Sequence, residues 1–210
     1  MNNLKNVLVA GANGSTGRSI VNLLKKSETY EPIAMVRKQD QKDYFENQGV
    51  KSVLADLEQD LDHAMINVDK VIFAAGSKGG DVIAVDQDGA KKLTNAAKQS
   101  GVEKFVMLSS MGADNPEQSN NLQDYLRAKQ NADDHLLNSG LNYSIVRPGQ
   151  LTNGGATGKI QLDEKIKTRG SISREDVAKT LVQVLDGEVK QNQVFEIISG
   201  DVPIAKAVYS

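Results

Sequence analysis

The sequence predicts an α/β fold, a doubly wound and mostly parallel sheet of about seven strands with helices on both faces. Short runs rich in Val, Ile and Leu alternate with longer stretches whose apolar residues recur at helical spacing. Several of the short runs lack polar alternation, as expected for parallel strands that helices cover on both sides. A glycine-rich turn joins the first run directly to the first helix.

Strands and helices are expected in alternation along the chain. The expected strands are Asn6–Ala10, Pro32–Val36, Lys51–Ala55, Lys70–Ala74, Lys104–Leu108, Asn142–Val146 and a last one near Gln193–Ile198. The expected helices are Arg18–Lys26, Lys42–Gln48, Val85–Gln99, Leu122–Asn138 and Arg174–Leu185. The least regular stretches, Asp114–Asn121 and Thr152–Ser171, both follow strands. They therefore fall at the edge of the sheet where ligands bind in such folds.

Length and composition indicate one ordinary domain over residues 1–210, with a small substrate-side segment at about 150–210. The formal net charge is -2, so neither a nucleic acid nor a membrane surface is an expected partner. The chain has no cysteine, which excludes disulfides and thiolate chemistry. Its two histidines are not placed to share an ion, so no metal site is expected. No apolar stretch approaches ~18 residues and no signal sequence is recognisable, so we expect a cytoplasmic location.

The most informative motif follows the first strand, where Gly11, Gly14 and Gly17 precede a helix at Gly-x-x-Gly-x-x-Gly spacing. A strand that turns into a helix in this way offers backbone N–H groups to the pyrophosphate of a dinucleotide. Gly11 permits the tight turn, Gly14 the close approach of the phosphates, and Gly17 the packing of helix on strand. The loop residues expected to bind the cofactor are Gly11, Asn13, Gly14, Ser15, Thr16 and Gly17.

The end of the second strand indicates which nicotinamide cofactor is bound. Enzymes specific for NAD usually place an acidic residue there to bind the ribose 2′-hydroxyl. This chain has Arg37 and Lys38 instead, about 20 residues beyond the last loop glycine. A guanidinium binds the 2′-phosphate of NADP, which a carboxylate would repel. The sequence therefore favours NADP (NADPH) over NAD.

The glycine spacing resembles that of the extended and atypical short-chain dehydrogenase/reductases, which have a Rossmann-type fold. The segments Leu54–Leu57, Phe73–Gly76 and Val85–Ala90 resemble the same family in order and spacing. The resemblance implies that Asp56 and Leu57 flank the adenine and that a small-residue turn lets the cofactor cross the sheet. It implies cofactor contacts at Asp56, Leu57, Ala74, Ala75, Gly76 and Asp86. Extended members carry Asn at the position of Asp86, and atypical members often carry Asp.

The candidate catalytic pair is Tyr125 and Lys129, four residues apart on an expected helix. At this spacing the ammonium lies near the phenol and lowers its pKa, so that Tyr125 can act as general acid or base. Lys129 falls within an apolar stripe of that helix, where a lysine needs a partner, and a cofactor ribose could provide one. The stripe consists of Leu122, Tyr125, Leu126, Ala132 and Leu136. The position matches the family's Tyr-x-x-x-Lys pair, which implies that Lys129 also contacts the nicotinamide ribose.

Two further positions follow from the resemblance. The family places a catalytic hydroxyl just after the fifth strand, where this chain has Ser110 followed by Met111. Met111 falls on the hydroxyl position itself, and the loop to Tyr125 is shorter than in extended members. Pro148 lies in an Arg-Pro-Gly segment similar to the turn that passes the nicotinamide carboxamide. The Pro-Gly pair also suits any plain turn.

These observations predict an NADP-dependent oxidoreductase of the atypical class, a monomer or homodimer that acts on a small carbonyl, quinone or flavin. One alternative is a non-catalytic NADP(H)-binding sensor, which the Met111 departure favours. Another is an NAD(P)-dependent sugar-nucleotide epimerase or dehydratase. Only about 60 residues follow the sixth strand, and a nucleotide-sugar site is hard to build from them.

Overall fold

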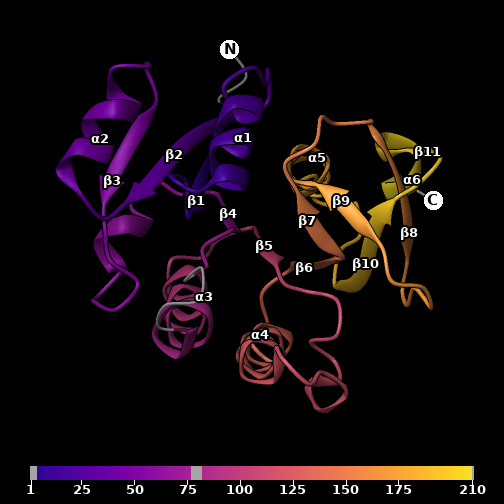
Figure 1. Cartoon of the computed structure of the whole chain (residues 1–210). Coiled ribbons are helices and arrows are strands. Elements are labelled where there is room, and N and C mark those ends of the chain that lie inside the picture. Colours follow the sequence, from indigo (N-terminus) through magenta and orange to yellow (C-terminus); the bar gives the residue numbers. More distant parts are fainter. Residues whose placement is uncertain (1–3, 77–81, 210) are drawn as a thin grey trace.

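The computed structural model describes residues 4–76 and 82–209, which form a large sheet with helices on both faces (Figure 1). The strands are β1 (Lys5–Ala10), β2 (Tyr30–Val36), β3 (Lys51–Leu54), β4 (Lys70–Phe73), β5 (Lys104–Leu108), β6 (Tyr143–Pro148), β7 (Gln150–Thr152), β8 (Lys159–Asp163), β9 (Ser171–Ser173), β10 (Gln193–Ser199) and β11 (Val202–Pro203). The α-helices are α1 (Ser15–Leu24), α2 (Gln39–Glu46), α3 (Ala90–Gln99), α4 (Gln123–Leu137), α5 (Arg174–Gln183) and α6 (Ile204–Tyr209). None of the helices in these ranges is long and apolar enough to cross a membrane.

The main sheet has the strand order β11-β8-β10-β6-β5-β4-β1-β2-β3. The seven strands from β10 to β3 in this order are parallel, and they are the seven strands that the sequence predicts. Chain order reverses between β1 and β4, because β2 lies on one side of β1 and β4 on the other. In open α/β sheets this reversal creates a crevice at the carboxyl ends of the strands, where ligands bind.

The stretch Thr152–Ser171, expected to be irregular, contains the unpredicted strand β8 and meets β7 and β9 at its two ends. Strand β8 pairs antiparallel with β10, and β11 pairs antiparallel with β8, so the main sheet has nine strands in the described residues. The β8 sequence Lys-Ile-Gln-Leu-Asp alternates polar and apolar residues, and Ile160 is buried while Gln161 is exposed. This alternation is typical of a strand covered on one face only. The expectation of an irregular segment was therefore wrong here.

Two hydrophobic layers cover the two faces of the sheet, and β1 contributes to both. Val7 and Val9 belong to the layer that includes α1 and α5, whereas Leu8 and Ala10 belong to the layer that includes α3 and α4. Figure 1 shows α1 and α5 on one side of the strands and α3 and α4 on the other. Successive strand residues point to opposite faces, so a continuous apolar run is buried on both sides. This burial fixes the end of β1, from which the glycine loop starts.

Two lysines at the amino ends of β4 and β5 bind the chain that follows α5. Lys70 donates a hydrogen bond from Nζ to the carbonyl of Leu185 at 3.0 Å. Lys104 donates from Nζ to the carbonyls of Asp186 and Val189, at 2.7 and 2.6 Å. Burial and the positive charge of Lys70 lower the pKa of Lys104 to about 8. The chain that follows α5 is thus held at the amino ends of the strands, whereas α5 begins at their carboxyl ends.

Candidate functional site: a cleft at the carboxyl ends of the strands

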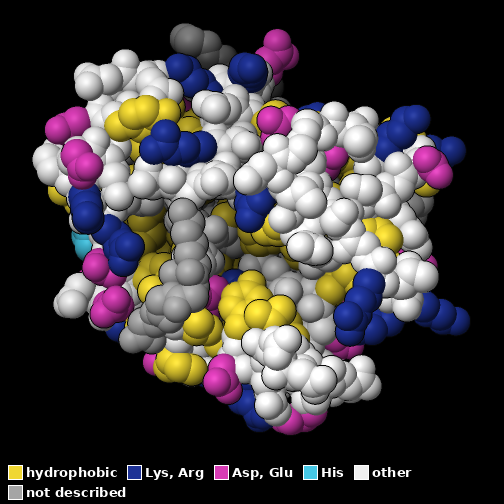
Figure 2. All heavy atoms as spheres, in the orientation of Figure 1, with side chains coloured by type: hydrophobic (Ala, Val, Ile, Leu, Met, Phe, Trp, Pro, Cys, Tyr) yellow, Lys and Arg dark blue, Asp and Glu magenta, His cyan; other side chains and the backbone are white. Residues whose placement is uncertain are grey.

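A cleft of about 920 Å³ opens where chain order reverses, at the carboxyl ends of β1, β2, β4 and β5. Hydrophobic side chains gather in the hollow in the middle of the face that Figure 2 shows. Most of the predicted site residues line this cleft: Gly11, Asn13, Gly14, Ser15, Thr16, Arg37, Asp56, Leu57, Ala74, Ala75, Gly76, Asp86, Tyr125 and Lys129. Gly17, Lys38, Ser110 and Pro148 are not among the lining residues. The cleft therefore unites segments that are far apart in the sequence.

The glycine loop has the backbone geometry that its sequence predicts. Gly11 has a φ of +84°, and a Cβ there would lie 2.6 Å from the backbone of Ala74 and Ala75. A Cβ on Gly17 would lie 2.1 Å from the carbonyl oxygen of Gly11, so Gly17 is required for helix α1 to pack closely on the loop. Gly14 donates its N–H to the Gly11 carbonyl at 2.9 Å. A side chain at Gly11 or Gly17 would clash with backbone atoms, so the turn requires glycine at both positions.

Arg18 holds the same loop from the first turn of α1, a role that the sequence did not reveal. Its Nη2 donates to Oδ1 of Asn13 at 2.6 Å, and its guanidinium lies 4.3 Å from the ring centroid of Tyr44. Stacking of a guanidinium on an aromatic ring limits its motion. Asn13, which lines the cleft, is therefore tied to both α1 and α2.

Arg37 lies at the end of β2, where the sequence places the determinant of cofactor choice. Its side chain is exposed and lines the cleft, and it forms no ion pair with a carboxylate in the described ranges. Gln41 accepts a hydrogen bond from the backbone N–H of Arg37 at 3.2 Å and also lines the cleft. Lys38 is the N-cap of α2 and lies outside the lining, so the two basic residues differ in position.

Lys129 lies at the floor of the cleft and pairs with Asp86. Its Nζ is 2.9 Å from Oδ1 of Asp86, and both side chains are buried. The same Nζ lies 5.7 Å from the ring centroid of Tyr125 and 5.9 Å from that of Phe73. The buried lysine thus has a carboxylate partner within the chain, where the sequence suggested a cofactor ribose. The predicted stripe is correct for Leu126, Ala132 and Leu136, but Leu122 is 56% exposed because it precedes the first turn of α4.

The electrostatic surroundings keep Lys129 charged. Burial alone would lower the pKa of Lys129, but Tyr125, Asp86 and Asp133 together raise it above its ordinary value. The helix that carries Asp86 begins as a π-helical turn, η2 (Ile83–Gly89), which packs against α4. π-Helical turns occur frequently at functional sites. The turn brings Asp86 and Tyr125 to the same cleft from two different helices.

The serine after β5 that lines the cleft is Ser109, and not Ser110, which the sequence predicts as the catalytic hydroxyl. The Ser110 hydroxyl donates to the Met111 carbonyl at 3.3 Å. Ser109 Oγ donates to Oδ2 of the buried Asp133 at 2.8 Å. The same Oδ2 accepts from Nε and Nη2 of Arg147, at 3.0 and 2.9 Å. Burial raises the pKa of Asp133, and Arg147 and Ser109 oppose that rise.

The predicted role of Pro148 has no counterpart in the cleft lining, because Pro148 is buried in β6 and pairs with Ile197 of β10. The sequence reading also missed three lining residues of the C-terminal segment, Leu151, Asn153 and Arg174. Ser173, before Arg174, is the N-cap of α5 and accepts from the Asp176 N–H, as its position before the helix suggests.

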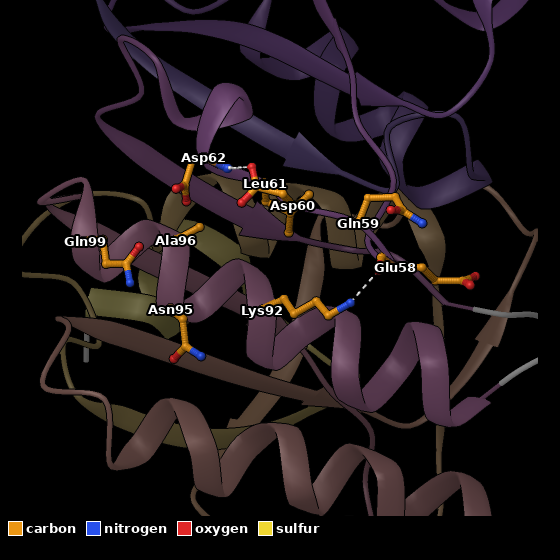
Figure 3. A pocket seen from close by; sticks show the side chains of 9 residues that line it. All are labelled: Glu58, Gln59, Asp60, Leu61, Asp62, Lys92, Asn95, Ala96 and Gln99. Atoms are coloured by element: carbon orange, nitrogen blue, oxygen red, sulfur yellow. Dashed lines mark hydrogen bonds between the residues drawn. The ribbon is translucent and has the colours of Figure 1, made fainter.

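A second pocket, of about 400 Å³, lies between residues 58–62 and α3 (Figure 3). Its lining is mostly polar and shares only Glu58 with the large cleft. Lys92 crosses it and donates to the carbonyl of Glu58 at 2.5 Å. Within the described ranges, no group of three or more His, Asp or Glu side chains could hold a metal ion. Of the predicted catalytic residues, Tyr125 and Lys129 line the large cleft and Ser110 does not.

The strand order, the glycine loop and the cleft at the reversal point define the class, a Rossmann-type dinucleotide-binding domain. A family model described as NAD(P)H-binding matches residues 11–188, and the chain belongs to that family. The uncharacterized sugar epimerase YhfK of Bacillus subtilis is 40% identical over 210 residues, 96% of this chain and 98% of YhfK.

Two solved structures are also similar. A Bacillus halodurans protein with the provisional description NAD-dependent epimerase/dehydratase has a TM-score of 0.93 at 40% identity, over 98% of this chain and 99% of that one. The anaerobillin reductase ChuY of Escherichia coli O157:H7 has a TM-score of 0.83 at 25% identity, over 94% of this chain and 98% of ChuY. These proteins agree with the resemblance to atypical short-chain dehydrogenase/reductases.

Proposed function

We propose that the protein is an NADP-dependent oxidoreductase that reduces or oxidises a small carbonyl, quinone or flavin substrate. The observation that carries the proposal is the single cleft that unites the glycine loop, Arg37 and the Tyr125–Lys129 pair. The cradle of the loop fits a pyrophosphate, because Gly11 and Gly17 lie where any Cβ would meet backbone atoms. When bound, the nicotinamide ring supplies or accepts the hydride.

The preference for NADP rests on Arg37. Its exposed guanidinium lines the cleft at the end of β2, without a carboxylate partner in the described part of the chain. An arginine at this position binds a 2′-phosphate through two parallel hydrogen bonds. Asp56, the acidic residue nearest to it on the lining in sequence, follows β3 and accepts the backbone N–H of Glu58 at 3.0 Å. At the end of β2, where NAD-specific enzymes place a carboxylate for the ribose 2′-hydroxyl, this chain thus has Arg37.

In the proposed reaction Tyr125 moves a proton to or from the substrate oxygen. The Nζ of Lys129 lies 5.7 Å from the Tyr125 ring centroid, so its positive charge can stabilise negative charge on the phenolic oxygen while the proton is transferred. Asp86 fixes the ammonium from the other side at 2.9 Å. Ser109 replaces Ser110 as the serine on the cleft wall, but its O–H donates to Asp133. We therefore expect the substrate oxygen to form its hydrogen bond with the Tyr125 hydroxyl.

Similar proteins carry both epimerase and reductase names, and the C-terminal segment favours the reductase. Residues 150–209 extend the main sheet with β10, β8 and β11 and cover one face with α5 and α6. They are not folded as a separate lobe that would enclose a nucleotide sugar. A small substrate is the ligand that such a segment can cover.

A non-catalytic NADP(H) sensor is the second candidate, because the serine on the cleft wall is engaged elsewhere. The Ser109 hydroxyl donates to Asp133, and Ser110 lies outside the lining. A Tyr125→Phe variant separates the two functions. An oxidoreductase loses roughly a hundredfold or more in turnover of quinone or aldehyde substrates and keeps its cofactor affinity. A sensor has no turnover to lose.

The first test of the proposal is titration of the purified protein with NADPH and NADH, followed by cofactor fluorescence. We expect tighter binding of NADPH, and Arg37→Gln should remove that preference with little effect on NADH. Lys38→Gln is the matched control, since Lys38 lies next to Arg37 but outside the cleft lining. Equal binding of the two cofactors by the unaltered protein would contradict the NADP preference. Binding of neither would contradict the proposed function.

A further inference from the structure

The C-terminal segment places a second arginine in the cleft. Arg174 is the first residue of α5, is half-buried, and lines the same cleft as Gly14 and Ser15 of the glycine loop. Helix α5 packs along α1, which begins at Ser15. The end of α5 lies at the opposite edge of the sheet, where Lys70 binds the carbonyl of Leu185. The start of α5 is therefore at the cleft edge, beside the start of α1.

The Arg174 guanidinium is oriented by a neutral side chain. Its Nη1 donates to Oδ1 of Asn153 at 2.7 Å, which is its only hydrogen bond to a residue in the described ranges. It forms no ion pair there, whereas Arg127 and Arg147 pair with Glu117 and Asp133. Asn153 thus fixes the direction of the guanidinium and leaves its charge uncompensated. Removing a charge partly from water is costly unless an opposite charge meets it.

We propose that Arg174, oriented by Asn153, is an oxyanion-binding residue of this cleft, and that its ligand is a phosphate or carboxylate group. A planar guanidinium with several unused N–H donors matches both groups bidentately. The inference rests on the proposed function, because that function supplies two sources of the anion. One is the pyrophosphate of the cofactor, which the position beside the glycine loop favours, and the other is an acidic group on the substrate.

The first arm of the test measures the binding of NADPH and NADH to an Arg174→Gln variant by fluorescence. Both cofactors carry the pyrophosphate, so both dissociation constants should rise about tenfold or more while their ratio stays constant. Arg37→Gln, in contrast, should change the ratio. Arg174→Lys keeps the positive charge but cannot form two parallel hydrogen bonds, so it should give an intermediate loss of affinity. Lys179→Gln is the matched control, because it removes a positive charge from α5 outside the cleft lining.

The second arm titrates the NADPH complex with 4-carboxybenzaldehyde and with benzaldehyde. If the anion belongs to the substrate, Arg174→Gln should weaken binding of the carboxylate compound about tenfold, and binding of benzaldehyde should not change. Unchanged constants in both arms would overturn the inference and leave the proposed function standing. Failure of the unaltered protein to bind either cofactor would instead overturn the proposed function, and this inference with it. Matching thermal unfolding of the variants and the unaltered protein excludes misfolding.

Discussion

The chain buries a lysine beside each end of β5, and the two differ in their partners. Lys104 begins the strand, is 1% exposed, and donates only to backbone carbonyls within the described part of the chain. Lys129 lies beside the end of the strand, is 3% exposed, and pairs with the carboxylate of Asp86. It also donates to the carbonyl of Leu108, the last residue of β5, at 3.4 Å. The same residue type thus serves two ends of one strand in different surroundings.

The surroundings of each lysine determine its pKa. Burial and the neighbouring Lys70 lower the pKa of Lys104 to about 8, because carbonyl dipoles do not compensate a full charge. Burial also opposes the charge of Lys129, but Tyr125 and Asp86 outweigh it and raise the pKa of Lys129. A lysine held by carbonyls fastens the chain. A lysine held by a carboxylate keeps its charge above pH 8, where Lys104 loses its proton.

The largest expected effect comes from Lys129→Met. Loss of the ammonium breaks the buried ion pair between Lys129 and Asp86, 2.9 Å apart, and breaking a buried pair costs about 3–5 kcal/mol of unfolding free energy. NADPH-dependent turnover should also fall by roughly a hundredfold or more. Urea unfolding followed by circular dichroism measures the first effect, and steady-state kinetics measures the second.

A double variant, Asp86→Asn with Lys129→Met, separates stability from chemistry at this site. It removes both charges, so much of the lost stability should return while turnover stays low. Turnover at the unaltered rate in Lys129→Met would contradict a role for this lysine in proton transfer. Lys129 would then have a purely structural role, like Lys104.

A smaller effect is expected from Lys104→Met, which leaves the carbonyls of Asp186 and Val189 without their donor. The unfolding free energy should fall by about 1–3 kcal/mol. The dissociation constant of NADPH should not change, because Lys104 lies at the edge of the sheet opposite the cleft. Lys98→Met, on the exposed surface of α3, should change stability by no more than about 0.5 kcal/mol. A weaker NADPH complex in Lys104→Met would contradict the separation of the two lysines.

The two lysines also mark what the sequence could predict. Lys129 was found from its four-residue spacing to Tyr125, and the seven parallel strands were found from apolar runs, because both signals are local. The partners of Lys104 are distant in the sequence, and only the packing of α5 brings them together. Arg174 reaches the cleft for the same reason.

Two further misses lie within reach of local reasoning. β5 ends at Leu108, as the sequence predicts, and the serine directly after it, Ser109, lines the cleft whereas the next one, Ser110, does not. In extended chain a shift of one residue points a side chain to the opposite side. Strand β8 carried an alternating pattern that could have identified it. The loop, the strands and the Tyr125–Lys129 pair were therefore predictable, but the partner of each buried charge was not.

The smallest expected effect is the pH dependence of stability, which isolates Lys104. Its pKa is about 8 in the folded protein and near 10.5 in the unfolded chain, so between these values the unfolded state binds more protons. The free energy of unfolding should therefore rise with pH from 8 to 9.5, by about 1 kcal/mol per unit at most. Lys129 adds nothing in this window, because its raised pKa keeps it protonated in both states. Urea unfolding at several pH values should show the rise in the unaltered protein and not in Lys104→Met. An equal slope in both proteins would mean that Lys104 keeps its proton despite its burial, as Lys129 does.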